Sequence, residues 1–134
     1  MDKSFENGCV LIVGGSGGIG SLCAQEFARS GARVAITYYK NEQAAVEVAS
    51  NIDNDVKIYQ LDNGDPKSVE ETFQKIINDH GSINTLVNAA GFDIPQKFIS
   101  EIDADLWREV IDADINGFFN LIKSGLPYLL GDRN

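Results

Sequence analysis

The sequence predicts an α/β fold in which helices cover both faces of a parallel sheet. Short apolar runs alternate with segments of helical periodicity along the chain, a pattern typical of strand–helix–strand units with right-handed crossovers. A glycine-rich stretch, VGGSGGIG (13–20), follows the first apolar run, at the point where such a fold turns from strand into helix. The length of 134 residues and the 43% hydrophobic content fit one domain, residues 1–134.

Four short apolar runs are the predicted strands. They cover residues 9–13, 33–37, 56–61 and 84–90. The first, CVLIV, contains no polar residue other than its cysteine, as expected for a parallel strand that is covered on both faces. A sheet of this kind brings the carboxyl ends of its strands to one edge, where ligands dock in doubly wound folds.

Helices are predicted between and after these strands, because apolar residues recur there at spacings of three and four. The first helix ends at Gly31 and the third begins at the N-cap and first-turn pair Asp65–Pro66. A long helical segment runs from about 103 to 121. The residues that carry these patterns are Ile19, Leu22, Cys23 and Phe27; Ala44, Ala45, Val48, Ala49 and Ile52; Val69, Phe73, Ile76 and Ile77; and Leu106, Val110, Gly117 and Leu121.

The composition excludes several classes of partner. The net charge is −9 and the acidic residues are dispersed, so nucleic acid and anionic membranes would be repelled. No apolar run approaches the roughly 18 residues of a membrane span, and the first residues, MDKSFENG, lack the layout of a secretory signal. Cys9 and Cys23 have no metal-ligand spacing and lie in apolar segments, which suits buried thiols in a reducing cytosol. We therefore expect a cytoplasmic protein without a metal site.

A loop that binds phosphate is predicted at residues 13–20. The stretch can be read as G-x-G-x-x-G from Gly15 or as G-x-x-x-G-x-G from Gly14. In either interpretation the free N–H groups and the dipole of the following helix would attract a pyrophosphate, and glycines would let it approach the backbone. The stretch does not end in Gly-Lys-Ser/Thr, which excludes the P-loop of ATP- and GTP-binding proteins.

The end of the second predicted strand bears on the choice of dinucleotide. In folds of this kind an acidic residue there accepts hydrogen bonds from the adenosine ribose of NAD. This chain has TYYK (37–40) instead, with no carboxylate before Glu42. A 2′-phosphate would meet no repulsion there and could pair with Lys40, which favours NADP(H) over NAD(H). The sequence is equally compatible with Lys40 as an ordinary solvated lysine.

The turn from Asn88 to Gly91 is a second candidate contact with the dinucleotide. It follows the fourth predicted strand, at the switch point where ligands dock in doubly wound sheets. Asn88 can bond the backbone, while Ala89, Ala90 and Gly91 are small enough to let a nucleoside approach. Small residues also suit simple packing of a strand against a helix, so the two interpretations coexist.

Four separated motifs give the chain a family resemblance. TLVNAAG (85–91) resembles the LVNNAG segment of the short-chain dehydrogenase/reductase family. The glycine signature of that family, T-G-x-x-x-G-x-G, begins at residue 13, where this chain has Val in place of Thr. QLDNGDPKSVEE (60–71) is similar to the D-V-(T/S)-D segment, and residues 103–129 resemble the long interface helix. The resemblance spans Gly8 to about Leu130, and NADPH-dependent ketoreductases of fatty-acid and polyketide type are the nearest subgroup.

The resemblance implies a Rossmann-like fold with strand order 3-2-1-4 and a set of cofactor contacts. Asp62 would accept a hydrogen bond from the adenine amino group. With the residues of the glycine loop, the second strand and the 88–91 turn, the predicted cofactor-binding residues are Gly14, Ser16, Gly17, Gly18, Ile19, Gly20, Tyr38, Lys40, Asp62, Asn63, Asn88, Ala89, Ala90 and Gly91.

The resemblance also implies a chemistry, hydride transfer between nicotinamide C4 and a carbonyl or alcohol carbon. The family uses Ser and Tyr-x-x-x-Lys for this reaction, on a fifth strand and the helix after it. None of the four tyrosines in this chain is followed four residues later by lysine. We therefore expect the chain to be the cofactor-binding half of an oxidoreductase, which a C-terminal half completes, either as the rest of the same protein or as a partner.

Asp114 is the candidate catalytic residue on this chain. It falls where the family has a catalytic Asn, by resemblance. Periodicity singles out the same position, because Asp114 lies four residues after Val110 and eight after Leu106, on the stripe expected to face inward. A carboxylate there would have to be protonated, hydrogen-bonded or paired with a cation. In the alternative, the helix rolls slightly and Asp114 meets water.

Two questions about partners and function stay open in the sequence. Trp107 and the pair Phe118–Phe119 could form core, a substrate wall or a subunit interface, and the resemblance implies a homo-oligomer. With strand order 3-2-1-4, TLVNAA would form an uncovered sheet edge. The two candidate functions are an NADP(H)-dependent reductase or alcohol dehydrogenase, acting on an unidentified carbonyl or alcohol, and a non-catalytic dinucleotide-binding or scaffold subunit.

Overall fold

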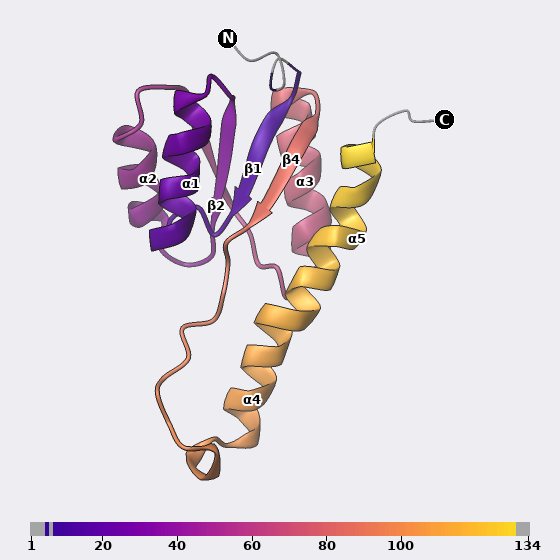
Figure 1. Ribbon diagram of the computed structural model, residues 1–134. Coiled ribbons are helices and arrows are strands. Elements are labelled where there is room, and N and C mark those ends of the chain that lie inside the picture. Colours follow the sequence, from indigo (N-terminus) through magenta and orange to yellow (C-terminus); the bar gives the residue numbers. More distant parts are fainter. Residues whose placement is uncertain (1–4, 6, 131–134) are drawn as a thin grey trace.

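The computed structural model describes residue 5 and residues 7–130. Its centre is a four-stranded parallel sheet of β1 (Cys9–Val13), β2 (Val34–Tyr38), β3 (Val56–Gln60) and β4 (Ile83–Asn88). The strand order is β3-β2-β1-β4 (Figure 1). The predicted α/β fold class and strand order are thereby confirmed, and β4 forms one edge of the sheet.

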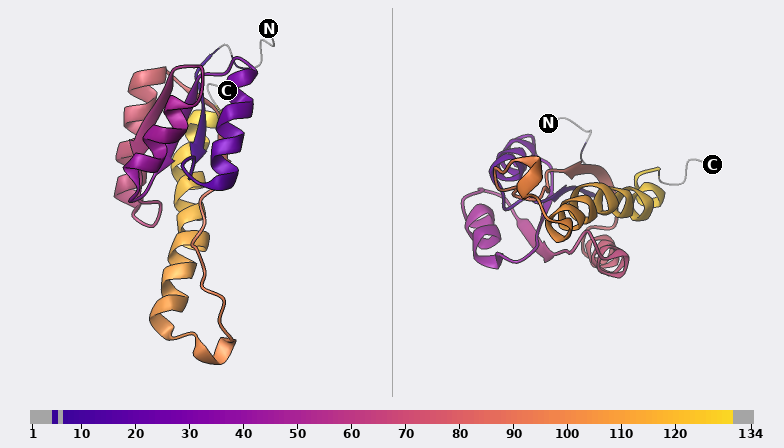
Figure 2. Two further views of the ribbon diagram at one scale, coloured as in Figure 1. Left: turned by 90° about the vertical axis from the view of Figure 1, so that its left-hand side faces the viewer. Right: turned by 90° about the horizontal axis from the view of Figure 1, so that it is seen from below.

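Helices cover both faces of the sheet. On one face lie α1 (Gly18–Arg29) and α2 (Glu42–Ser50); on the other lie α3 (Pro66–His80) and α5 (Gly117–Leu130) (Figures 1 and 2). The alternation of side chains along β1 divides the core accordingly, since successive strand residues point to opposite faces. Cys9, Leu11 and Val13 pack with α3 and α5, whereas Val10 and Ile12 pack with α1 and α2.

The helix boundaries follow capping chemistry. The Asn41 side chain accepts a hydrogen bond from Ala44 N at the start of α2. Asp65, which precedes Pro66, likewise accepts from Lys67 N at the start of α3, as the sequence predicted. Such side chains satisfy N–H groups that lack helical partners. Gly81 ends α3 with a φ of +84°, a conformation that glycine adopts without strain.

The buried face of α1 differs from the one that its apolar pattern suggests. Ile19 is 76% exposed and Leu22 is 62% exposed, although both belong to the periodic pattern that predicted the helix. The buried residues of α1 are Gly20 and Ala24, because small side chains let this helix lie close to β1. Cys9 is buried as predicted, whereas Cys23 is only half-buried.

The long helical segment that the sequence predicts over 103–121 is divided by a wider turn. It consists of α4 (Ala104–Ile111), the π-helical turn η3 (Asp112–Asn116) and α5. A short 3₁₀ turn, η2 (Ile99–Glu101), precedes α4. The upper part of α5 lies against the sheet, while α4 and η2 extend beyond the carboxyl ends of the strands (Figures 1 and 2). In the described part of the chain, no helix has both the length and the apolar character needed to cross a bilayer.

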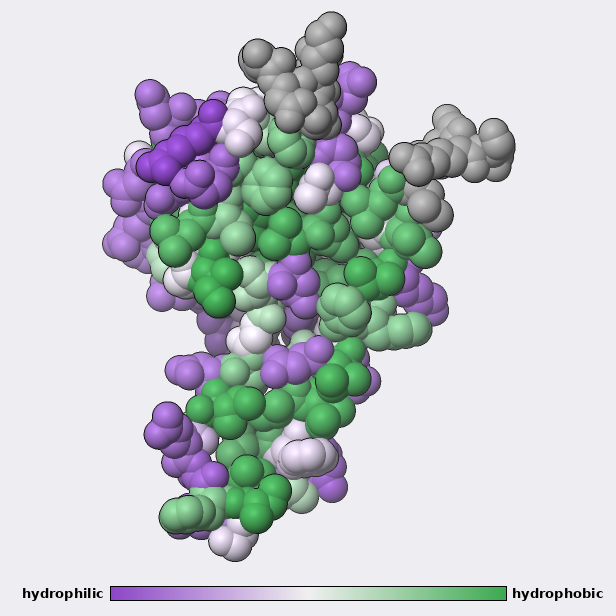
Figure 3. Space-filling model, in the orientation of Figure 1, coloured by the Kyte–Doolittle hydropathy of each residue, from purple (hydrophilic) through white to green (hydrophobic). Residues whose placement is uncertain are grey.

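The apolar residues of this segment divide into two groups. Leu121 is completely buried against the sheet. The other group is exposed, and we refer to these residues together as the outer face of α4–α5; the space-filling view shows apolar surface over this segment (Figure 3). Its residues are Trp107, Ile115, Phe118, Phe119 and Ile122. Trp107 and the Phe118–Phe119 pair therefore do not belong to the core of the described chain.

Candidate functional site

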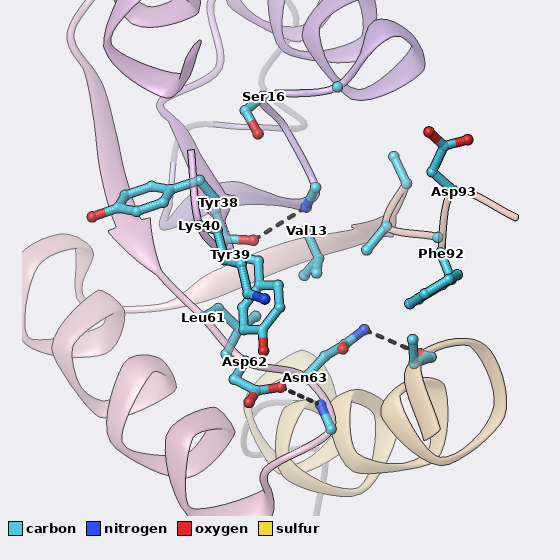
Figure 4. A pocket seen from close by; sticks show the side chains of 18 of the residues that line it. Val13, Ser16, Tyr38, Tyr39, Lys40, Leu61, Asp62, Asn63, Phe92 and Asp93 are labelled. Carbon is cyan, nitrogen blue, oxygen red and sulfur yellow. Dashed lines mark hydrogen bonds between the residues drawn. The ribbon is translucent and has the colours of Figure 1, made fainter. Parts of the chain in front are cut away.

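A cavity of about 710 Å³ lies at the carboxyl ends of the four strands. This is the expected place for a ligand in a doubly wound sheet, and the volume is within the usual range of small-molecule sites. The walls come from the glycine loop, the ends of β2 and β3, the turn after β4 and the π-turn η3 (Figure 4). Its lining includes Val13, Gly14, Ser16, Gly17, Thr37, Tyr38, Tyr39, Lys40, Leu61, Asp62, Asn63, Gly64, Ala89, Ala90, Gly91, Phe92, Asp93, Glu109, Asp112 and Ala113.

The glycine loop has a conformation that larger residues could not adopt. Gly14 has a φ of +75°, and a Cβ atom there would lie 2.7 Å from Ala90 N. At Gly20 a Cβ atom would overlap the Gly14 carbonyl oxygen and lie 2.8 Å from Gly15 Cα. Gly17 N donates to Gly14 O at 3.1 Å, which closes the turn. Gly20 thus contributes by packing beneath the loop rather than by lining the cavity.

The start of α1 fits an anionic ligand. Its N-cap residue, Gly17, offers no side-chain hydrogen bond, and the first turn contains no acidic residue. A Cβ atom at Gly18 would meet nothing within 4 Å, so the approach to this turn is open. The first N–H groups of a helix need partners and carry the positive end of its dipole. These amides fit a pyrophosphate, with Ser16 and Gly17 on the cavity wall and Ile19 directed outward.

Thr37 is a site residue that the sequence analysis missed. Its hydroxyl accepts a hydrogen bond from Gly14 N at 3.1 Å, and its side chain is almost fully buried. The bond ties the end of β2 to the first glycine of the loop (Figure 4). The available signal was a hydroxyl residue at the carboxyl end of the strand that neighbours β1, since parallel strands end at the same edge.

The two tyrosines after Thr37 point in different directions. Figure 4 shows the Tyr38 ring directed away from the cavity and the Tyr39 ring directed towards Asp62. Desolvation, and then the Glu42 carboxylate, raise the pKa of the Tyr38 hydroxyl. Lys40 Nζ lies 5.0 Å from the centroid of the Tyr39 ring, within the range of a cation–π contact. Tyr38 and Lys40, which the sequence predicts as cofactor contacts, both belong to the cavity lining, and of the two tyrosines Tyr39 is the one whose ring lies on the cavity side.

The turn after β3 places Asp62 and Asn63 at the cavity wall. Asp62 Oδ1 accepts from Gly64 N at 3.0 Å, and Asp62 N donates to Ser68 Oγ at 3.1 Å, so this turn is held at both ends. The carboxylate has further lone pairs for a ligand donor. Asn63 also lines the cavity, but its amide nitrogen donates to Ala113 O of the π-turn at 3.3 Å.

The turn after β4 closes against β1. Ala89 N donates to Val13 O at 2.9 Å, which continues the strand pairing by one residue. Asn88 Oδ1 accepts from Ala90 N at 3.2 Å, so the Asn88 side chain shapes the turn and stands outside the cavity lining. Ala89, Ala90 and Gly91 do line the cavity, as the small size of their side chains suggested.

Asp114 lies behind the wall of the cavity. It is half-buried, and its Oδ1 accepts a hydrogen bond from Phe92 N at 2.9 Å. Of the possibilities that the sequence left for this carboxylate, the structure has the hydrogen-bonded one. The π-turn residues that do line the cavity are Asp112 and Ala113.

The charges around the cavity are unevenly distributed. Four carboxylates line it, those of Asp62, Asp93, Glu109 and Asp112, whereas Lys40 is the single basic residue of its described lining. A polyanionic ligand is therefore attracted by α1 and Lys40, and repelled near α4.

Comparisons with known proteins agree with this geometry. A family model described as short chain dehydrogenase matches residues 8–134. The chain is 28% identical over 120 residues to an uncharacterised oxidoreductase of Staphylococcus epidermidis, covering 90% of this chain and 51% of that protein. It is 30% identical over 132 residues to the 3-oxoacyl-[acyl-carrier-protein] reductase FabG of Thermotoga maritima, covering 97% of this chain and 53% of that reductase.

A solved structure of a dehydrogenase/reductase from Sinorhizobium meliloti superposes with a TM-score of 0.85 at 28% identity. The superposition covers 94% of this chain and 51% of the other. The chain thus spans about half the length of the curated relatives and solved structures it matches.

Proposed function

The chain belongs to the short chain dehydrogenase family, and from that premise we propose that it binds the dinucleotide cofactor of an oxidoreductase. The observation that carries the proposal is the uncapped start of α1, which faces a cavity at the strand ends beside a loop that only glycine can form. Such a loop and helix N-terminus suit a pyrophosphate. A bound nicotinamide would supply hydride exchange with a carbonyl or alcohol carbon.

Different residues of the chain would hold different parts of this cofactor. The amides of Gly18 and Ile19, in the first turn of α1, would hold the pyrophosphate, and Thr37 keeps Gly14 in place beneath it. Asp62 would accept from the adenine amino group while the Tyr39 ring covers the adenine face, because both border the same part of the cavity. Aromatic stacking on a base contributes about 1–3 kcal/mol.

We propose NADP(H) as the preferred dinucleotide. The cavity has no carboxylate at the end of β2 to receive the ribose hydroxyls of NAD, and Lys40 lies there beside Tyr39. A lysine at this place can pair with a 2′-phosphate, whereas a carboxylate would repel it. The proposal predicts discrimination at one side chain and is therefore directly testable.

The test is titration of the purified chain with NADPH and NADH, followed by nicotinamide fluorescence and by calorimetry. Lys40→Ala should weaken NADPH binding by about tenfold, the loss of one charge-assisted bond, and leave NADH binding unchanged. Tyr39→Ala should weaken both, whereas Tyr39→Phe, the control that keeps the aromatic ring, should weaken neither. No binding of either dinucleotide to a folded sample would refute the proposed function.

For the chemical step, the chain itself offers Asp114 where the family has a catalytic Asn. Since its carboxylate accepts from Phe92 N, we propose that Asp114 fixes the segment after β4 rather than transferring a proton. The proton donor of the family, the Tyr of Tyr-x-x-x-Lys, has no counterpart among the four tyrosines of this sequence. We propose that a C-terminal half or a partner chain supplies it.

A second candidate function is a dinucleotide-binding subunit without catalysis, which the carboxylate of Asp114 in place of the family's amide favours. The intact mass of the single polypeptide, measured under denaturing conditions on protein from its natural source, separates the two. A mass close to twice the 14.6 kDa of this chain supports the oxidoreductase. A mass near 14.6 kDa, with dinucleotide binding and no partner of similar size, supports the binding subunit.

A further inference from the structure

The π-turn η3 is tied to the rest of the molecule from two sides. On one side, Asp114 Oδ1 accepts from Phe92 N at 2.9 Å, after β4. On the other, Asn63 Nδ2 donates to Ala113 O at 3.3 Å, after β3. π-turns are rare and occur frequently at functional sites. Both hydrogen bonds join η3 to segments that line the cavity, so the position of η3 depends on the turn after β3 and the turn after β4.

The contact of Asn63 with this turn is closely fitted. A Cβ atom at Gly117 would lie 2.7 Å from Asn63 Cγ and 2.8 Å from its Nδ2, so the side-chain amide lies directly against the glycine backbone. Asn120 Nδ2 donates to Asn63 O at 2.9 Å, and Asn120 is 9% exposed. Asn63 is thus bonded through its side chain to η3 and through its backbone to α5 (Figure 4 shows the former).

The identity of residue 63 has a specific consequence. The family segment that this stretch resembles, D-V-(T/S)-D, has valine after its first aspartate, and the side chain of valine has no hydrogen-bond donor. Here Asn63 directly follows Asp62, the residue placed to receive the adenine amino group. One turn therefore carries both a nucleotide contact and a hydrogen-bond donor to the π-turn.

We propose that Asn63 is a positioning residue that couples occupancy of the adenosine end of the cavity to the π-turn that carries Asp114. The inference rests on the proposed function, because the ligand that fixes Asp62 is the adenosine half of the dinucleotide. With Asp62 held, the Asn63 amide stays against Ala113 O and Gly117, and the π-turn opens less often. Coupling of this kind needs no change of fold and is measured as a change in local opening.

The experiment measures hydrogen exchange of the amides of residues 112–117 with and without saturating 2′,5′-ADP, which represents the adenosine half of NADP. In the wild-type chain the ligand should slow this exchange by about fivefold, as expected for one stabilised hydrogen bond. Asn63→Asp keeps the shape of the side chain, removes its N–H donor and adds a negative charge. Asn63→Val removes the donor without adding a charge. Each variant is first titrated with 2′,5′-ADP, and exchange is then measured at a concentration that saturates that variant. Under these conditions the slowing over 112–117 should be lost.

A matched control separates the loss of the donor from the added charge. Asn41→Asp introduces the same charge at the N-cap of α2, where Asp accepts from Ala44 N as well as Asn does. The slowing over 112–117 should persist in this variant. Gly117→Ala, which pushes the Asn63 amide away without changing it, should abolish the slowing as Asn63→Val does.

The outcomes distinguish this proposal from the one on which it rests. If neither 2′,5′-ADP nor NADPH binds the folded wild-type chain, the proposed function fails, and the coupling fails with it. If the ligand binds but exchange over 112–117 is unchanged in the wild type, only the coupling is refuted. The same holds if Asn63→Asp and Asn63→Val keep the full slowing, because the adenosine then acts through another route. A merely structural role for Asn63 would raise basal exchange equally with and without ligand.

Discussion

Strand β1 and the outer face of α4–α5 are both apolar, but only one of them is covered. Every residue of β1 is buried, with helices on both sides. On the outer face, by contrast, Trp107 is 55% exposed and Phe119 is 61% exposed, and α4 has no buried residue. The exposed residues are of a size that usually contributes to cores or interfaces.

The difference indicates where the interactions of this chain are complete. Around β1 the sheet, the glycine loop and the cavity are held by contacts within the described residues. The outer face has no such cover within the described residues.

The largest difference in stability is expected between two substitutions that lie two residues apart on α5. Leu121→Ala removes a fully buried side chain and should lower the free energy of unfolding by about 2–5 kcal/mol. Phe119→Ala, on the outer face, should change it by less than about 0.5 kcal/mol. Urea unfolding followed by circular dichroism measures both. A loss of stability in Phe119→Ala that grows with protein concentration would mean that a second copy covers the outer face.

The glycine loop should respond next most strongly. Gly20→Ala places a methyl group on the Gly14 carbonyl and the Gly15 backbone, so we expect a loss of about 1–3 kcal/mol of stability together with loss of NADPH binding. Gly18→Ala, where the new methyl group meets nothing, is the control and should keep the fold. Equal NADPH affinity in Gly20→Ala and the wild type would contradict the loop geometry described above.

A smaller effect is expected where β2 supports the loop. Thr37→Val removes the acceptor of Gly14 N and leaves that N–H group without its partner, which should cost about 1–2 kcal/mol of stability and weaken NADPH binding. Thr37→Ser keeps the hydroxyl and should retain most of the affinity. If valine and serine behave alike in the titration, the hydrogen bond does not shape the loop.

Most of the region around β1 could be predicted from the sequence, because local patterns determine it. The run CVLIV, the glycine spacing and the Asp65–Pro66 cap each identify their own structure without reference to distant residues. Strand order depended on the family resemblance, and the comparison of Ile19 with Gly20 shows the limit of periodicity. The helix was predicted correctly, but close approach to β1 selected the small residues as its buried face.

The helical segment after β4 was less predictable for a physical reason. A π-turn differs from an α-helix by one residue, and apolar spacing does not reveal where that residue is inserted. The contacts that hold it, from Asn63 and Phe92, come from segments about 50 and 22 residues away in sequence. The contribution of Tyr39 to the cavity could not be predicted either, since the direction of a side chain after a strand depends on where the strand ends.

The smallest expected effect is a pH dependence of stability, and it concerns a buried histidine in the region of the sheet. His80, at the end of α3, is 7% exposed, and its Nε2 has no hydrogen-bond partner within the described chain. Burial lowers its pKa below the ordinary 6.5, and the charges of Lys57 and Arg33 add to this, against the opposing effect of Asp79 and Asp55. The Tyr59 ring packs against the imidazole edge to face.

A histidine with a lowered pKa in the folded state binds its proton first in the unfolded state. Its contribution to stability is therefore complete above pH 6.5 and is lost as the pH falls through 6.5 towards the folded-state pKa. Urea unfolding at pH 7.5 and at pH 5.5, about one unit on either side of the ordinary histidine pKa, should show lower stability at the acidic pH. His80→Phe keeps an aromatic ring beside Tyr59 and cannot titrate, so this variant should lose less stability between the two pH values. Equal losses in His80→Phe and the wild type would exclude His80 as the source of the acid sensitivity.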